Sequence, residues 1–132
     1  AIVLLQPTSP LRDSNDIKAS CKMFRKFKAD SLVSVVEVPH SYNPKNLYSF
    51  KNNILKPLNS KNILNLAQKA QKFYARNGAS IYITKTKNLK KYILGGKILG
   101  YKMSTMKSLD INNIEDFILA EQIQKIFKLN LR

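Results

Sequence analysis

The sequence predicts an α/β protein, and three stretches near its beginning predict it. Ile2 to Leu5 form a short apolar run closed by turn residues, which is typical of a buried strand that leads into a loop. Asn15 to Lys28 carry apolar residues at helical spacing between lysines, which indicates an amphipathic helix. Ser31 to Val38 are rich in β-branched residues and predict a second strand, ended by Pro39. The order strand, helix, strand predicts a βαβ unit with parallel strands and a right-handed crossover.

The loop after the first strand reads Gln6-Pro7-Thr8-Ser9-Pro10. Its two prolines fix their own φ angles and restrict the residue before each of them. A rigid polar loop at the carboxyl end of a strand is where open α/β sheets bind ligands. The same shape also suits a strand-to-helix turn without any chemistry, and shape alone does not separate these two interpretations.

Further elements are predicted along the rest of the chain by the same patterns of spacing and turn residues. In chain order they are a hairpin of Leu47–Phe50 with Ile54–Leu58, a small helix at 62–71, a strand at 80–84, a short basic helix at 87–94, a strand at 98–103 and an amphipathic helix at 114–128.

The length of 132 residues allows one domain or part of one. An apolar content of 44% is enough for a core, and no apolar run approaches the roughly 18 residues that a membrane span needs. No signal peptide is visible. Cys21 is the single cysteine, so an internal disulfide is excluded, and its place on the apolar stripe of the first helix predicts a core residue. We expect a cytoplasmic protein with no membrane partner.

The net charge of +15 is unevenly distributed, because no acidic residue occurs between Glu37 and Asp110. A surface of this kind attracts polyanions, among them nucleic acids bound through their phosphates. The alternative is a bias of composition toward Lys, Asn and Ile, as an AT-rich genome would encourage. We favour this alternative and expect no nucleic-acid partner, because no aromatic-interleaved RNA-binding signature accompanies the lysines. A noncatalytic basic module that binds nucleic acid stays the competing hypothesis.

Three stretches in order carry a resemblance to one family. Ile2–Arg12 read IVLLQPTSPLR, and Arg76–Ile83 read RNGASIYI. Ser108–Asn112 read SLDIN, followed by the letters EDF and AE within 115–121. Together they resemble the signature motifs of the acylneuraminate cytidylyltransferase family, the CMP-sialic acid synthetases and their relatives that act on pseudaminic and legionaminic acid. Three ordered matches over most of the chain are more specific than any one of them.

The resemblance implies a Rossmann-like three-layer nucleotide-diphospho-sugar transferase fold, incomplete at the amino end. The family places a Gly-rich phosphate loop upstream of the LLQPTSPLR motif, and this chain begins at Ala1 without one. Residues 1–132 are therefore expected to be a single partial cytidylyltransferase domain, the carboxy-terminal part of the family's domain. In the family the middle region, about 45–75 here, is an excursion that packs against a second subunit and helps to complete its active site. This implies a homodimer.

The implied activity is the transfer of CMP from CTP to a sialic-acid-like 2-keto sugar acid of nine carbons, with release of pyrophosphate. Such a product serves the biosynthesis of surface glycans such as lipopolysaccharide. A nucleotidyltransferase for another sugar is an alternative. This chemistry depends on positioning and charge neutralisation, so it needs no catalytic triad, and none is visible.

Asp110 and Asn112 are the candidate ligands of a Mg²⁺ cofactor. They alternate along an extended segment, so their side chains share one face, and oxygen atoms paired in this way suit Mg²⁺. The family has two aspartates at this spacing, and here the second is Asn112. By the resemblance Asp110 is also catalytic. An alternative role for Asp110 or Asn113 is to cap the last helix.

By the resemblance, Gln6 contacts substrate, and Asn77 and Tyr82 bind the acylated sugar. The family often has a histidine near the position of His40, at the mouth of the sugar pocket.

Two arginines complete the candidate site. Arg12 closes the first motif and is a catalytic candidate that holds anionic groups, or it only fixes the loop. Arg76 either pairs with a substrate carboxylate or phosphate through its planar fork, or it is a solvated turn residue.

Overall fold

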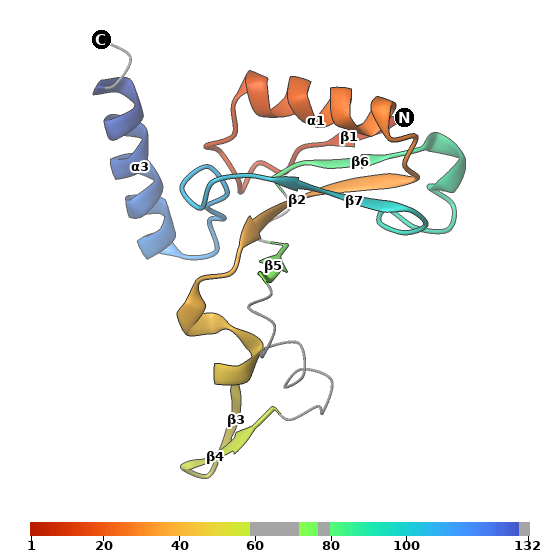
Figure 1. Ribbon diagram of the computed structural model, residues 1–132. Helices are drawn as coiled ribbons and strands as arrows, with labels where there is room; N and C mark the ends of the chain where they lie inside the picture. The colour runs from red at the N-terminus through yellow and green to blue at the C-terminus, as the bar shows by residue number, and fades with distance from the viewer. Residues whose placement is uncertain (59–71, 77–79, 130–132) are drawn as a thin grey trace. The chain divides into compact units, whose positions relative to one another are not determined.

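The structure, a computed structural model, describes residues 1–58, 72–76 and 80–129. The chain forms two compact units, one from Ala1–Val36 with Arg76–Arg132 and the other from Glu37–Ala75 (Figure 1). The predicted excursion of residues 45–75 lies within the second unit. The helix predicted at 62–71 falls outside the described residues.

The first unit is a mixed α/β structure built on a mixed sheet. Its strands are β1 (Ile2–Leu4), β6 (Tyr82–Thr84), β2 (Ser31–Glu37) and β7 (Ile98–Lys102). β6 lies between β1 and β2 and is antiparallel to both, whereas β2 and β7 are parallel. The predicted α/β class is therefore confirmed at this level.

The two strands of the predicted βαβ unit run in the same direction but are not neighbours in the sheet. β1 and β2 run the same way on either side of α1 (Ser14–Lys26) in the chain, but β6 separates them in the sheet. In the described part of the chain β1 pairs with β6 alone and forms an edge. Ile2, Val3 and Leu4 are accordingly 46%, 38% and 41% exposed. The apolar run predicted a buried strand, and this prediction is wrong for the described residues, because too few neighbours cover an edge strand.

The core of the first unit lies between α1 and one face of the sheet (Figure 1). Ile81 and Ile83 are almost fully buried and alternate with the half-buried Tyr82, as expected of a strand with one core face. Cys21 packs against this core from α1, which agrees with the structural role predicted for it. The buried residues of the cluster are Phe24, Ala29, Leu32, Ile81, Ile83 and Met103.

Two buried serines of β2 use their hydroxyl groups to hold neighbouring segments. Ser31 Oγ donates to Gly95 O over 2.7 Å and accepts from Gly95 N over 3.0 Å. Ser34 Oγ accepts from Ile81 N over 3.0 Å. Because each buried hydroxyl has a partner, these polar residues fit an otherwise apolar strand.

The short basic helix predicted at 87–94 is not present. A single 3-10 turn, Thr86–Asn88, is followed by further turns, and Asn88 O accepts from Lys91 N. Lys87, Lys90 and Lys91 would stand three and four positions apart on an α-helix, where like charges repel. This repulsion disfavours a helix at these residues.

The last helix, α3 (Ile114–Leu129), is confirmed within a residue at its carboxyl end. Asn113 caps it, because Asp116 N donates to Asn113 Oδ1 over 2.8 Å. Of its described side chains, Ala120 and Ile123 are buried. Much of its apolar stripe is exposed, namely Ile114, Phe117, Ile118, Leu119 and Ile126. Since Asn113 provides the cap, Asp110 is available for another role.

The second unit begins with two short 3-10 turns, His40–Tyr42 and Pro44–Asn46, followed by the hairpin of β3 (Tyr48–Lys51) and β4 (Ile54–Pro57). This is the predicted hairpin. Its turn consists of Asn52 and Asn53, with φ angles of 51° and 61°. Asparagine tolerates this left-handed region better than most residues, which explains the tight two-residue connection.

The two ends of the second unit lie side by side. Val38 N donates to Phe73 O over 2.9 Å, and Lys72 Nζ lies 2.9 Å from Glu37 Oε1, close to the short strand β5 (Tyr74–Ala75). An excursion that leaves and rejoins a domain at neighbouring points has this arrangement. Among the described helices, none combines the length and the apolar character needed to cross a membrane.

Candidate functional site

Two loops that are distant in the sequence meet at one edge of the first unit. We call residues 5–13, between β1 and α1, and residues 103–113, between β7 and α3, the loop junction. Ile111 N donates to Thr8 O over 2.8 Å, and Ser9 Oγ donates to Asp110 Oδ1 over 3.3 Å. The structure therefore brings together the first and the third of the motifs that carry the family resemblance.

The loop of the first motif is held by its own arginine. Arg12 Nη1 donates to Gln6 O over 2.7 Å and also to Ser9 O. Ser9 N donates to Gln6 O over 3.3 Å, and Ser9 is fully buried. Burial lowers the pKa of Arg12 below its usual value, although an arginine stays charged. Of the two roles that the sequence left open, the structure shows the fixing of the loop, and the binding of anions by Arg12 stays a prediction.

Asp110 and Asn112 face each other, as their alternation predicted. Asn112 Nδ2 lies 3.4 Å from Asp110 Oδ2, and Asp110 is half-buried while Asn112 is exposed. Side-chain oxygens at these two positions are within reach of one ion if the Asn112 amide turns its oxygen inward, a rotation that exchanges two nearly isosteric groups.

Asp110 and Asn112 fit Mg²⁺ as two of its ligands. Mg²⁺ in nucleotide sites is commonly held by one or two carboxylates together with substrate phosphates and water. Within residues 1–58, 72–76 and 80–129, no three side chains of His, Cys, Asp or Glu gather in a way that could hold a metal. One carboxylate and one amide would supply two ligands, so phosphate oxygens and water would have to supply the others.

Tyr82 lies at the same edge of the sheet as the loop junction. It pairs with Leu4 at the end of β1 and with Val33 of β2, so it stands two residues from Gln6 across the strand pair. Because Ile81 and Ile83 enter the core beneath α1, the Tyr82 side chain faces the other side of the sheet. Tyr82 and Gln6 are each half-buried.

The remaining candidate substrate residues are Arg76, Asn77 and His40. Arg76 is exposed where the chain re-enters the first unit, and Asn77 lies outside the described residues. His40 is exposed in the second unit, where its carbonyl oxygen accepts from Asn43 N over 3.2 Å. Sugar contacts by these three residues stay predictions.

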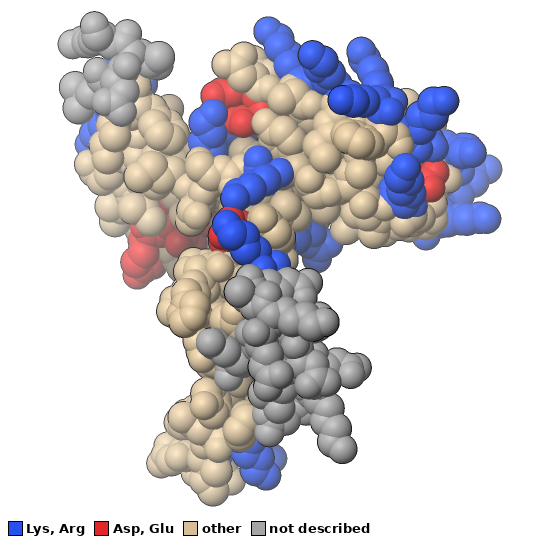
Figure 2. Space-filling model, viewed as in Figure 1, with Lys and Arg blue, Asp and Glu red and all other residues tan. Residues whose placement is uncertain are grey.

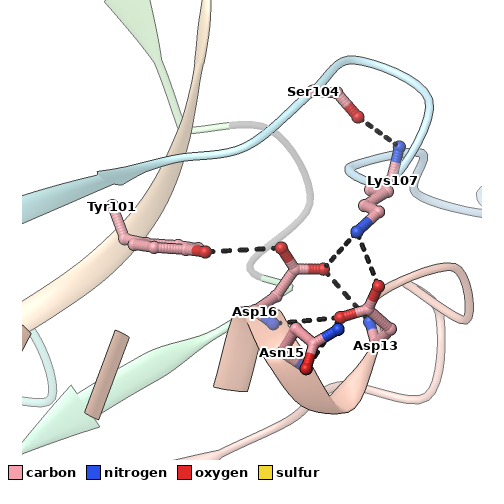
Figure 3. A network of polar contacts seen from close by, with 6 residues as sticks. All are labelled: Asp13, Asn15, Asp16, Tyr101, Ser104 and Lys107. Carbon is pink, nitrogen blue, oxygen red and sulfur yellow. Dashed lines mark hydrogen bonds and ion pairs between the residues drawn. The ribbon is translucent and has the colours of Figure 1, made fainter. Parts of the chain in front are cut away.

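A polar network at the loop junction was not predicted from the sequence (Figure 3). Lys107 Nζ lies 2.6 Å from Asp13 Oδ2 and 3.2 Å from Asp16 Oδ2. Tyr101 OH contacts Asp16 Oδ1 at 3.4 Å. Asp13 is the N-cap of α1 and Asp16 completes its capping box, which is a local role. No local pattern identifies Lys107 as their partner, because it lies more than 90 residues further along the chain.

The environment of the network shifts the pKa values of Asp13, Lys107 and Tyr101. The hydrogen bond from Lys107 lowers the pKa of Asp13 to about 2, and the same bond raises the pKa of Lys107. Burial, followed by the negative charge of Asp16, raises the pKa of Tyr101. At neutral pH Asp13 and Lys107 are therefore both charged.

Comparisons with the models of known protein families and with curated proteins find no match for this chain. The resemblance to the cytidylyltransferases is carried by its own three motifs.

Proposed function

We propose that this chain belongs to a nucleotidyltransferase that transfers CMP from CTP to a sialic-acid-like 2-keto sugar acid. One observation carries the proposal: the QPTSPLR loop and the Asp110 segment, about 100 residues apart, are in direct contact through Ser9 and Ile111. A shared site requires that these two motifs lie in contact. Tyr82, from the middle motif, lies at the same edge.

The proposed complete fold is a Rossmann-like three-layer nucleotide-diphospho-sugar transferase fold. The described sheet offers one layer and α1 a second. β1 is an edge strand among the described residues, so further strands could join it through backbone hydrogen bonds, and its Ile2, Val3 and Leu4 side chains are exposed. These features support the proposed fold.

In the proposed reaction, the anomeric hydroxyl of the sugar acid attacks the α-phosphorus of CTP. A new phosphorus–oxygen bond forms, the bond to the β-phosphate bridge breaks, pyrophosphate leaves, and the hydroxyl proton passes to solvent. Bound Mg²⁺ would neutralise charge on the phosphates. Asp110 and Asn112 would hold the ion, and Arg12 would keep the loop rigid. Gln6 would contact substrate, and Tyr82 would contact the sugar. Positioning of this kind contributes most of the catalysis in phosphoryl transfer.

The activity is tested by incubating the complete protein with CTP, Mg²⁺ and sialic, pseudaminic or legionaminic acid, and measuring pyrophosphate. We expect release with at least one acid and its loss when Mg²⁺ is chelated. No release with any of the three would refute the proposal. Replacing CTP by other nucleoside triphosphates separates it from a nucleotidyltransferase for another sugar.

The hairpin of the second unit is proposed as the contact of a homodimer. Its large apolar side chains are unusually exposed for so small an element, with Phe50 at 69%, Ile54 at 60% and Leu55 at 59%. Apolar surface of this kind is typical of an interaction site. Sedimentation equilibrium should show a dimer for the native protein and a monomer for Phe50→Ser, with Lys56→Ser as a matched change of an exposed polar residue. A Phe50→Ser protein that stays dimeric would contradict this contact.

The distribution of lysines on the surface favours a second hypothesis, the binding of nucleic acid. Lysines gather over α1 and over the turns at the end of the sheet away from the loop junction (Figure 2). The exposed members in these turns include Lys87, Lys90, Lys91 and Lys97. This hypothesis requires binding to random oligonucleotides with a steep salt dependence. The proposed enzyme requires none, so binding that is absent or independent of salt removes the hypothesis.

A further inference from the structure

Lys107 joins the two loops of the junction through charged groups. Its ammonium group is shared by Asp13 and Asp16, at 2.6 and 3.2 Å, and its side chain is 31% exposed. Asp13 is the N-cap of α1, and its Oδ1 accepts from Asn15 N and Asp16 N. Asp16 Oδ2 in turn accepts from Asp13 N over 3.2 Å. The two carboxylates are thus fixed by the first turn of α1, and Lys107 reaches them from the loop between β7 and α3 (Figure 3).

The segment around Lys107 is a closed turn. Lys107 N donates to Ser104 Oγ over 3.3 Å, and Ser108 N donates to Ser104 O over 3.1 Å. Its beginning is fixed by the sheet, because Met103 N donates to Val35 O over 2.9 Å. A shift of Lys107 would therefore be transmitted to the residues that follow it.

Asp110 lies between two fixed points of this loop. Three residues before Asp110, Lys107 pairs with the carboxylates of α1. One residue after Asp110, Ile111 N donates to Thr8 O. The contacts of the Asp110 carboxylate itself are long, at 3.3 Å to Ser9 Oγ and 3.4 Å to Asn112 Nδ2. Its position is accordingly determined more by the loop backbone than by its own hydrogen bonds.

We propose that Lys107 is a positioning residue, whose pairing with Asp13 and Asp16 clamps the 104–112 loop to α1 and thereby places Asp110 for its role at the site. The role of Asp110 rests on the proposed cytidylyltransferase function, whereas the clamping of the loop does not. Removal of the ammonium group would leave two carboxylates facing each other without a cation, so the loop would lose an attraction and α1 would keep an uncompensated repulsion.

The test compares Lys107→Met and Lys107→Arg with a matched control, Lys85→Met, in the complete protein. Lys85 Nζ also pairs with a carboxylate, Asp30 Oδ1 at 2.9 Å, and its side chain is 34% exposed, but it lies at the other end of the sheet. The first measurement is amide hydrogen exchange at Ile111, which reports the opening of the loop. We expect Lys107→Met to speed exchange there about tenfold, and Lys85→Met to leave it unchanged. Lys107→Arg should restore most of the protection.

The second measurement separates positioning from general stability. At saturating CTP and sugar, we expect Lys107→Met to lower kcat about tenfold and to raise the Mg²⁺ concentration needed for half-maximal rate, because a displaced ligand weakens the metal site. Lys107→Arg should recover kcat, and Lys85→Met should keep it.

Unchanged exchange at Ile111 in Lys107→Met, or equal effects of Lys107→Met and Lys85→Met, would overturn the clamp. Faster exchange with an unchanged kcat and Mg²⁺ requirement would show that the clamp does not place Asp110. An unsubstituted protein that releases no pyrophosphate refutes the proposed function, and the exchange measurement still decides whether Lys107 holds the loop.

Discussion

The two ends of the described sheet each hold a cluster of lysine and aspartate, but the two clusters connect different segments of the chain. At the loop junction, Lys107 pairs with Asp13 and Asp16. At the opposite end, Asp30 accepts from Lys85 Nζ over 2.9 Å and from Lys97 N over 3.0 Å. The backbone bond from Lys97, followed by the bond from Lys85, lowers the pKa of Asp30. The chemistry of the two clusters is therefore almost the same.

The difference lies in what each cluster connects. The Asp30 cluster joins turns of the framework, since Asp30 N donates to Lys97 O and Lys85 N donates to Asp30 O. None of these residues belongs to a motif of the family resemblance. The Lys107 cluster joins α1 to the loop that bears Asp110, beside the QPTSPLR loop. An ion pair thus marks no site by itself, and its meaning depends on the segments that it holds.

The largest expected effect distinguishes these two ends directly. Asp110→Asn should lower kcat more than about 100-fold, because it removes the only carboxylate of the proposed metal pair, while the melting temperature changes little. Asp30→Asn is the matched control and should lower the melting temperature with kcat retained. Steady-state kinetics and thermal unfolding measure both. If both variants lose activity equally, the distinction between the ends is wrong.

Gly96→Ala should give the next largest effect, and only on stability. Gly96 has a φ of +65°, and an added Cβ would lie 2.7 Å from Asp30 Cβ and 2.8 Å from Tyr92 Oη. A left-handed backbone and a close contact with a framework turn should together cost about 2 kcal/mol of unfolding free energy. Denaturant unfolding measures this loss. The Mg²⁺ requirement of the folded fraction should stay the same, and a change in it would mean that the framework end also affects the site.

The positions of helices and strands along the chain could be predicted from the sequence better than the pairing of the strands. Asn52 and Asn53 marked the hairpin turn, and the spacing from Ile114 onward marked the last helix, because both signals are local. The insertion of β6 beside β1 depends on residues 80 positions apart, which no local period reveals. For the same reason the exposure of Ile2 could not be predicted from its apolar run.

The candidate site shows the same limit. Asp110 and Asn112 were predicted by their alternation along an extended segment, and their side chains lie 3.4 Å apart, whereas their role as metal ligands stays a prediction. Ser9 was visible only as a turn residue, and Lys107 only as one lysine among many. Their partners are 101 and 94 residues away, so their roles depend on the tertiary fold.

Asp13→Ala should have a moderate effect on the junction end. It removes a capping box and one partner of Lys107, and loss of an N-cap costs about 1 kcal/mol. The pKa of Asp13 is about 2 when folded, below its ordinary value, so its stabilisation is full above roughly pH 4 and is lost as the pH falls toward 2. The difference in unfolding free energy between the native protein and the variant should therefore shrink as the pH falls below about 4 and be lost near pH 2. A difference that persists unchanged to pH 2 would show that the Asp13 charge is not what stabilises this end.

The smallest expected effect is a gain in the free energy of unfolding from a change at the end of the sheet that holds Asp30. Lys28 follows the C-cap of α1 with a φ of 49°, a position where glycine is the usual residue. Lys28→Gly should relieve the left-handed strain and raise the free energy of unfolding by about 0.5 kcal/mol, after the greater flexibility of glycine in the unfolded chain is subtracted. Lys28→Ala removes the same charge but keeps a Cβ, so it should give no gain. Equal gains in both variants would mean that charge repulsion among the lysines, rather than backbone strain, limits the stability of this end.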